Sequence, residues 1–195
     1  MKYMRTPQLI GVAVPLLREL RAGVLAASAP ADAVRTLREA GFAGGDAVYR
    51  AFEQWLGESG YSSPSSAGES AGRAASLSLA EFGERTSRFF HDAGWGDVTF
   101  SSDESNGTAA LDIAHCWEGE DPATAAVDWP GCHITTGMLA AFFGRIAGYP
   151  VAVLETECSA AGNSRCRFQM GNADVMKYKW EEETKSVARR SDAET

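Results

Sequence analysis

The chain has 195 residues, of which 45% are hydrophobic and 23% charged, the composition of an ordinary globular protein. This length fits one domain whose core is large enough to fold without a disulfide framework. The formal net charge is −8 at neutral pH, and the Lys and Arg residues are scattered along the chain. Since nucleic acids and anionic membranes are recognised by clustered basic residues, we expect neither direct nucleic-acid binding nor membrane docking.

The N-terminal apolar run, residues 9–17, superficially resembles a signal peptide. Pro15 interrupts it, and Arg18 and Glu19 follow where a cleavage site would lie. Nowhere does an apolar run approach the roughly 20 residues that a membrane-spanning helix needs. We therefore predict a cytoplasmic protein without a membrane span.

The first third of the sequence predicts helices. Apolar residues recur at helical spacing over 9–24, where Pro15 indicates either a kink or a second helix start. Two further helices are predicted over 33–40, ended by Gly41, and over 46–56, ended by Gly57. Residues 57–76 are rich in Gly and Ser and predict a loop.

The remainder mixes helices and strands. Ser78-Leu-Ala-Glu81 has the form of a capping box and predicts a helix to about Asp92. The later elements expected are strands 97–100 and 108–115 in a hairpin, helix 133–146, strands 151–156 and 164–170, and a C-terminal helix over 174–187. We predict an α+β fold in which N-terminal helices pack on an antiparallel sheet of about four strands.

All four cysteines, Cys116, Cys132, Cys158 and Cys166, lie in the C-terminal half. Clustered cysteines in a cytosolic protein favour metal or redox chemistry over disulfides. A hairpin would bring the last two thiols together, Glu155 precedes them on the same strand, and Cys132 opens a helix. Three thiolates and one carboxylate form a closed tetrahedral set suited to zinc. The alternative, that these are buried free thiols packed as small hydrophobic groups, stays open at this point.

Two segments carry a family resemblance: Cys132-His-Ile-Thr-Thr-Gly-Met-Leu-Ala-Ala-Phe-Phe-Gly-Arg, and Val153-Leu-Glu-Thr-Glu-Cys-Ser-Ala-Ala-Gly-Asn-Ser-Arg-Cys-Arg-Phe. They resemble the 4-vinyl reductase domain family, which includes aromatic-effector sensing domains of transcription activators, predicted hydrocarbon-binding proteins and a bacteriochlorophyll-biosynthesis protein. Its fold is shared with the TRAPP vesicle-tethering subunits. The resemblance implies that Cys132, Glu155, Cys158 and Cys166 hold a structural Zn²⁺ ion.

The resemblance covers about residues 94–170. It implies a zinc- and ligand-binding core over 94–171, preceded by a helical part of the same domain over 1–93 and followed by a C-terminal helix or tail over 172–195. Cys116 falls outside the four-ligand pattern, so it is either a buried thiol or a replacement for Glu155 in an all-cysteine site.

Aromatic residues gather in the region that resembles the family's pocket, and pockets for small molecules are mostly apolar. Each of them could equally be ordinary core. The residues that we predict to contact a ligand are His115, Trp117, Trp129, Phe142, Phe143 and Tyr149. We expect the zinc to fix the hairpin against the helix and to form one wall of this pocket.

Three functions follow from the resemblance. The first is a sensor or carrier domain that binds a hydrophobic molecule, aromatic or tetrapyrrole-like. The second is an accessory protein or reductase in (bacterio)chlorophyll biosynthesis, although the sequence has no nicotinamide or flavin motif, which favours binding over catalysis. The third is a tethering subunit. A homodimer and a separate signalling or biosynthetic protein partner are expected with it.

Overall fold

The computed structural model of the chain describes residues 11–59, 72–103, 105–121 and 131–181. Its described helices are α1 (Val14–Ala27), α2 (Pro30–Glu58), α3 (Leu79–Asp92) and α4 (His133–Ala147), with two short 3-10 turns, η2 (Arg73–Ser76) and η4 (Ser159–Ala161). The strands are β1 (Asp97–Asp103), β2 (Thr108–Ala114), β3 (Val151–Glu157) and β4 (Cys166–Asn172). The predicted α+β class is confirmed.

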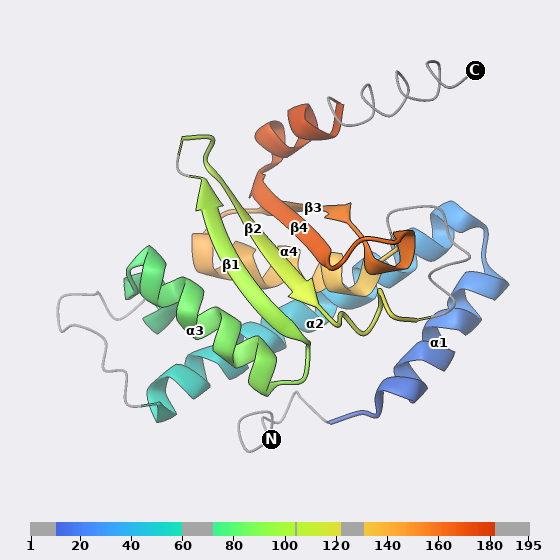
Figure 1. Cartoon of the computed structure of the whole chain (residues 1–195), viewed down its shortest axis with the longest axis horizontal. Helices are drawn as coiled ribbons and strands as arrows, with labels where there is room; N and C mark the ends of the chain where they lie inside the picture. Colours follow the sequence, from blue (N-terminus) through green and yellow to red (C-terminus); the bar gives the residue numbers. More distant parts are fainter. Residues whose placement is uncertain (1–10, 60–71, 104, 122–130, 182–195) are drawn as a thin grey trace.

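The four strands form one antiparallel sheet in the order β1-β2-β4-β3. Figure 1 shows α2 and α4 crossing behind this sheet, with α3 alongside β1. Because side chains alternate along a strand, one face of the sheet supplies apolar residues to the core and the other supplies polar residues. A row of paired residues on the core face, Phe100, Leu111, Phe168 and Glu155, runs across all four strands.

The two helices predicted over 33–40 and 46–56 are one continuous helix, α2. That prediction was wrong because Gly41 is a contact residue and not a helix end. A Cβ atom at Gly41 would lie 2.0 Å from the Ile134 carbonyl oxygen of α4, and one at Gly45 would lie 2.5 Å from that of Met138. Glycine is therefore required for the close approach of the two helices.

Facing them on α4, Gly137 approaches the Arg38 carbonyl oxygen in the same way, at 2.0 Å from the position of a Cβ. The small residues of α4, which predict that something packs closely on this helix, receive α2.

Other helix boundaries follow the sequence signals. Pro15 lies in the first turn of α1, so it marks a helix start and not a kink. Ser78 caps α3, and the predicted capping box with Glu81 is present. The core between the helices and the sheet is rich in aromatic rings, with Phe52, Phe89, Phe90 and Phe142 in mutual contact.

Beyond β4, residues 173–181 are helical, as predicted, and residues 182–187 of that predicted helix lie outside the described ranges. Within the described residues, no helix is both long and apolar enough to cross a membrane.

Candidate metal and ligand sites

Four side chains from distant parts of the sequence converge at one end of the sheet. Cys132 precedes the first turn of α4, Glu155 lies in β3, Cys158 follows β3, and Cys166 begins β4. One ligand atom from each lies within 4.8 Å of the others. The Cys132 sulfur is 4.0 Å from that of Cys158 and 3.6 Å from that of Cys166. The sequence-predicted set is thus brought together, and this buried Cys/Glu cluster could hold a metal ion.

Glu155 is the unusual member of its surroundings. Its neighbours in the row across the sheet are apolar, yet it is a fully buried carboxylate. Its Oε2 accepts a hydrogen bond of 2.9 Å from the Cys132 amide, while its Oε1 has no hydrogen-bond partner among the described residues. Burial, and next the neighbouring Cys158, raise the pKa of Glu155 to about 8. A buried, unpartnered carboxylate oxygen is costly, and a cation would satisfy it.

A β-bulge between Glu155 and Glu157 decides which of the two carboxylates belongs to the cluster. In a regular strand, residues two apart point to the same face, but a bulge redirects the side chain that follows it. Glu157 instead pairs with Arg165 at 3.3 Å.

The sulfur atoms have close polar neighbours. The Ser159 amide donates to the Cys166 sulfur at 3.4 Å, and the Ser159 hydroxyl lies 3.2 Å from it. Cys116 is buried with its sulfur 3.9 Å from that of Cys132, although it is outside the set of four whose ligand atoms are all mutually close. Three thiols and one carboxylate, closed to further protein donors, match the ligand chemistry of a structural zinc site.

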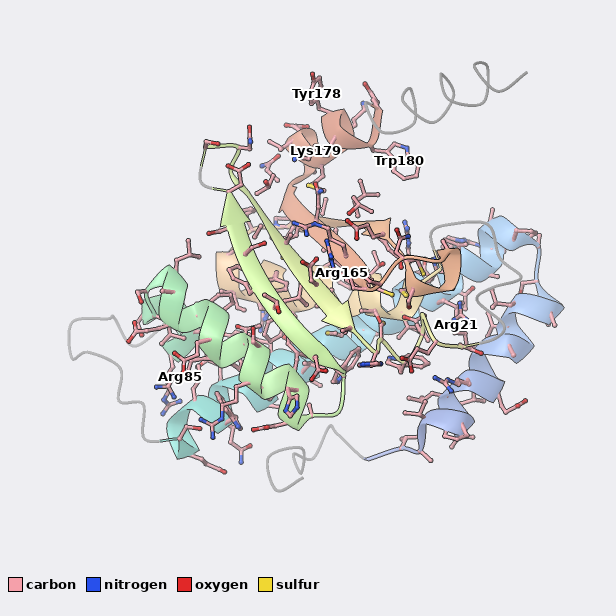
Figure 2. All side chains as sticks on the ribbon, viewed as in Figure 1. Arg21, Arg85, Arg165, Tyr178, Lys179 and Trp180 are labelled. Atoms are coloured by element: carbon pink, nitrogen blue, oxygen red, sulfur yellow. The ribbon has the colours of Figure 1, made fainter. Side chains whose placement is uncertain are left out.

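A buried ion-pair network, which the sequence analysis missed, borders this cluster. Arg21 of α1 is 1% exposed and contacts Glu118 at 3.2 Å and Asp121 at 3.0 Å. Glu118 also accepts from the amides of Ile134 and Thr135, in the first turn of α4. Figure 2 shows Arg21 where α1 meets the body of the molecule. The only signal in the sequence was an arginine within the apolar periodicity of α1 and an acidic loop far along the chain.

His133, which the sequence places beside a metal ligand, is buried without a hydrogen-bond partner for either ring nitrogen among the described residues. Burial, followed by the charges of Arg38 and Arg21, lowers the pKa of His133 to about 4. The ring is therefore neutral at physiological pH.

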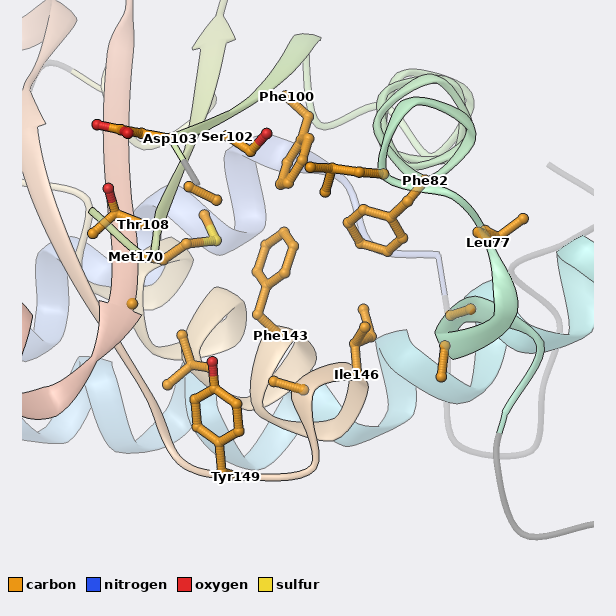
Figure 3. A pocket seen from close by; sticks show the side chains of 18 residues that line it. Leu77, Phe82, Phe100, Ser102, Asp103, Thr108, Phe143, Ile146, Tyr149 and Met170 are labelled. Carbon is orange, nitrogen blue, oxygen red and sulfur yellow. The ribbon is translucent and has the colours of Figure 1, made fainter. Parts of the chain in front are cut away.

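A cavity of about 490 Å³ lies at the opposite end of α4, between α3, α4, η2 and the core face of the sheet. Its wall is mainly apolar, with Phe82, Phe100, Phe143, Ile146 and Met170 around the space shown in Figure 3. None of the four clustered donor residues lines it. The expectation that the metal forms a wall of the pocket therefore does not apply to this cavity.

The six residues predicted to contact a ligand are placed differently. Phe143 and Tyr149 line the cavity. Phe142 is fully buried in the aromatic core, and Trp117 is buried in the loop after β2. His115 is exposed and bonds Glu120 at 2.9 Å, and Trp129 lies outside the described residues. Phe82, Phe100, Ile146 and Met170 are lining residues that sequence reasoning missed.

An α+β domain with a buried donor cluster and an apolar cavity is the class that this geometry defines. Residues 118–172 match the family model of the vinyl-4-reductase domain, which confirms the resemblance to the 4-vinyl reductase domain family over these residues. No curated protein sequence matches the chain.

Solved structures extend the similarity to most of the fold. The phenol-responsive sensory domain of the transcription activator PoxR, determined with phenol, is 17% identical with a TM-score of 0.60, covering 87% of this chain and 81% of its own. A trafficking protein particle complex subunit 3 from Naegleria fowleri, covalently bound to palmitic acid, is 12% identical with a TM-score of 0.52, covering 81% and 93%. These matches show the shared fold.

Proposed function

We propose that this chain is a small-molecule-binding domain, a sensor or carrier, that holds a hydrophobic ligand in the cavity between α3, α4 and the sheet. The observation that carries the proposal is the cavity itself, about 490 Å³ in volume and bounded by aromatic and aliphatic side chains. Most of a folded core is packed without voids of this size, and apolar cavities with a few polar groups are typical ligand sites. The vinyl-4-reductase domain match and the phenol found with the PoxR domain support the same interpretation.

The proposal includes a structural Zn²⁺ ion held by Cys132, Glu155, Cys158 and Cys166. Four protein donors leave no open coordination position, so the metal would join β3, β4 and the start of α4 and would not take part in a reaction. The unpartnered Oε1 of Glu155 supports this assignment because the carboxylate lacks a partner that a cation would supply.

Metal content and ligand binding can be measured on the same purified chain. Elemental analysis is expected to find one zinc ion per chain, and a fluorescent neutral probe such as 2-naphthalenemethanol is expected to bind. Ile146→Trp fills the cavity and should abolish probe binding, while Ala43→Trp, at an exposed position on α2, should not. Equal probe binding by both variants would contradict the cavity as the ligand site.

A homodimer is part of the proposal. Leu16 and Leu20 of α1 are 53% and 62% exposed, and exposed apolar side chains on one helix are typical of association surfaces. Native mass spectrometry should report a dimer, and Leu16→Glu combined with Leu20→Glu should convert it to a monomer with its zinc retained. A monomeric wild-type chain would remove this part of the proposal.

A further inference from the structure

The cavity lacks any group that could neutralise an anionic ligand. Its described lining contains no Lys, Arg or His, and its polar side chains are the hydroxyls of Ser102, Thr108 and Tyr149 together with Asp103. An ionised carboxylate that enters an apolar site without a cation or hydrogen-bond donors pays a large desolvation cost. A hydroxyl on the same carbon skeleton loses much less and can bond to these side-chain oxygens.

Asp103 does not direct its charge into the cavity. Its Oδ1 accepts from the Ser105 hydroxyl at 2.6 Å and its Oδ2 from the Asn106 side-chain amide. Figure 3 shows the Asp103 carboxylate directed away from the cavity, while Ser102 lies beside Phe100 at its edge. The charge of Asp103 thus serves its own turn, and its sign would repel an anion at the entrance.

The nearest described cations belong to another place. Arg167 and Lys179 line a smaller cleft of about 240 Å³ that includes Ser101 and Ala110. Ser101 alternates with Phe100 and Ser102 along β1, so it faces the other side of the sheet. Arg167 is already paired with Asp112 at 3.0 Å.

We infer that the cavity selects uncharged hydrophobic molecules, with at most one small hydrogen-bonding group placed near Ser102 and Thr108, and rejects carboxylates of the same shape. This rests on the proposed function, since it assigns a ligand class to the same cavity. The selection comes from what the wall does not offer an anion, so it should appear for aromatic and aliphatic skeletons alike.

Matched probe pairs test the inference on the full zinc-loaded chain. The pairs are 2-naphthalenemethanol with 2-naphthoate and 1-decanol with decanoate, titrated at pH 7.5. Each alcohol is expected to bind at least about tenfold more tightly than its carboxylate, because the charge has no partner in the site.

Ser102→Lys places a cation at the edge of the cavity, at an exposed position that tolerates it. It is expected to improve carboxylate binding about tenfold while the alcohols change by less than about twofold. Ser102→Gln controls for side-chain bulk, and Ser101→Lys adds the same charge to the opposite face of β1. Neither should improve carboxylate binding.

The outcomes separate the two levels of the argument. If the carboxylates bind as tightly as the alcohols to the wild-type chain, or if Ser101→Lys helps them as much as Ser102→Lys, selection by the cavity wall is overturned and the proposed function stands. If neither alcohol binds, the cavity is not a ligand site and both fall.

Discussion

The two ends of α4 and β4 differ in how their side chains are satisfied. At one end, Cys132 and Cys166 open the two elements, and the surroundings are thiols, carboxylates and an arginine, all buried. At the other end, Phe143, Ile146 and Met170 leave a space that the protein does not fill. With a rise of 1.5 Å per residue, the helix separates the ends by about 20 Å.

This difference teaches where stability and binding are located in the molecule. The donor end joins elements that are far apart in the sequence and is expected to determine whether the domain folds. The cavity end gives up packing and is expected to determine what the domain binds. Changes at one end should therefore leave the property of the other end intact in any protein that remains folded.

The largest effect is expected from Cys166→Ser. It removes a thiolate shared by the proposed metal site and the start of β4, so zinc should be lost and the free energy of unfolding should fall by about 5 kcal/mol or more. Elemental analysis and chemical denaturation measure both. Cys116→Ser, which changes a buried thiol outside the set of four, should keep one zinc per chain. If Cys116→Ser also empties the site, the all-cysteine alternative gains support.

Arg21→Met should destabilise the same end without removing a metal ligand. Breaking a buried ion pair leaves uncompensated charge on Glu118 and Asp121, at a cost of about 3–5 kcal/mol. The expected result is a lower denaturation midpoint with zinc still bound. Arg35→Met, which removes an exposed pair with Asp32, should change stability by less than about 1 kcal/mol. Equal effects from the two variants would show that the buried network contributes nothing special.

The sequence predicted the donor end far better than the cavity end. Thiols and a carboxylate at fixed spacing are rare enough to be read directly, and the four residues do converge. Phe82, Phe100 and Ile146 are ordinary core residues in sequence, and only the gap between the elements distinguishes them. Arg21 and Glu118 are 97 residues apart, so their pairing depends on tertiary structure that no local pattern encodes.

Glycine in α2 shows the same limit and gives a smaller effect. Gly41 was expected to end a helix, but it meets the start of α4 at the donor end. Gly41→Ala should cost about 1–3 kcal/mol or more, because the two backbones must separate. Gly44→Ala is the matched control: nothing lies within 4 Å of its added Cβ, so its helix propensity should raise stability by about 0.5–1 kcal/mol. Thermal unfolding of both variants measures the contrast, and equal shifts would contradict the close helix contact.

The smallest change expected at neutral pH concerns His133, the one buried side chain of the donor end that has neither a charge nor a hydrogen bond to offer. His133→Leu fills a similar volume and removes two unpartnered nitrogens, so it should stabilise the protein by about 1–2 kcal/mol at pH 7.5 with zinc retained. A less stable variant with full zinc content would mean that the imidazole has a partner the described residues do not include.

The pH dependence of this pair of proteins sharpens the same test. Because the pKa of His133 is about 4 in the folded state and about 6.5 when unfolded, the unfolded chain binds the proton first as the pH falls. The wild type therefore loses stability from pH 6.5 toward pH 4, and His133→Leu is spared that loss. The stability difference between the two should widen over this window by about 3 kcal/mol at most, while loss of zinc at low pH affects both alike and cancels. A difference that stays constant with pH would show that the ring is not held neutral by its surroundings, and that the donor end is less completely closed to water than the cavity end requires for the comparison to hold.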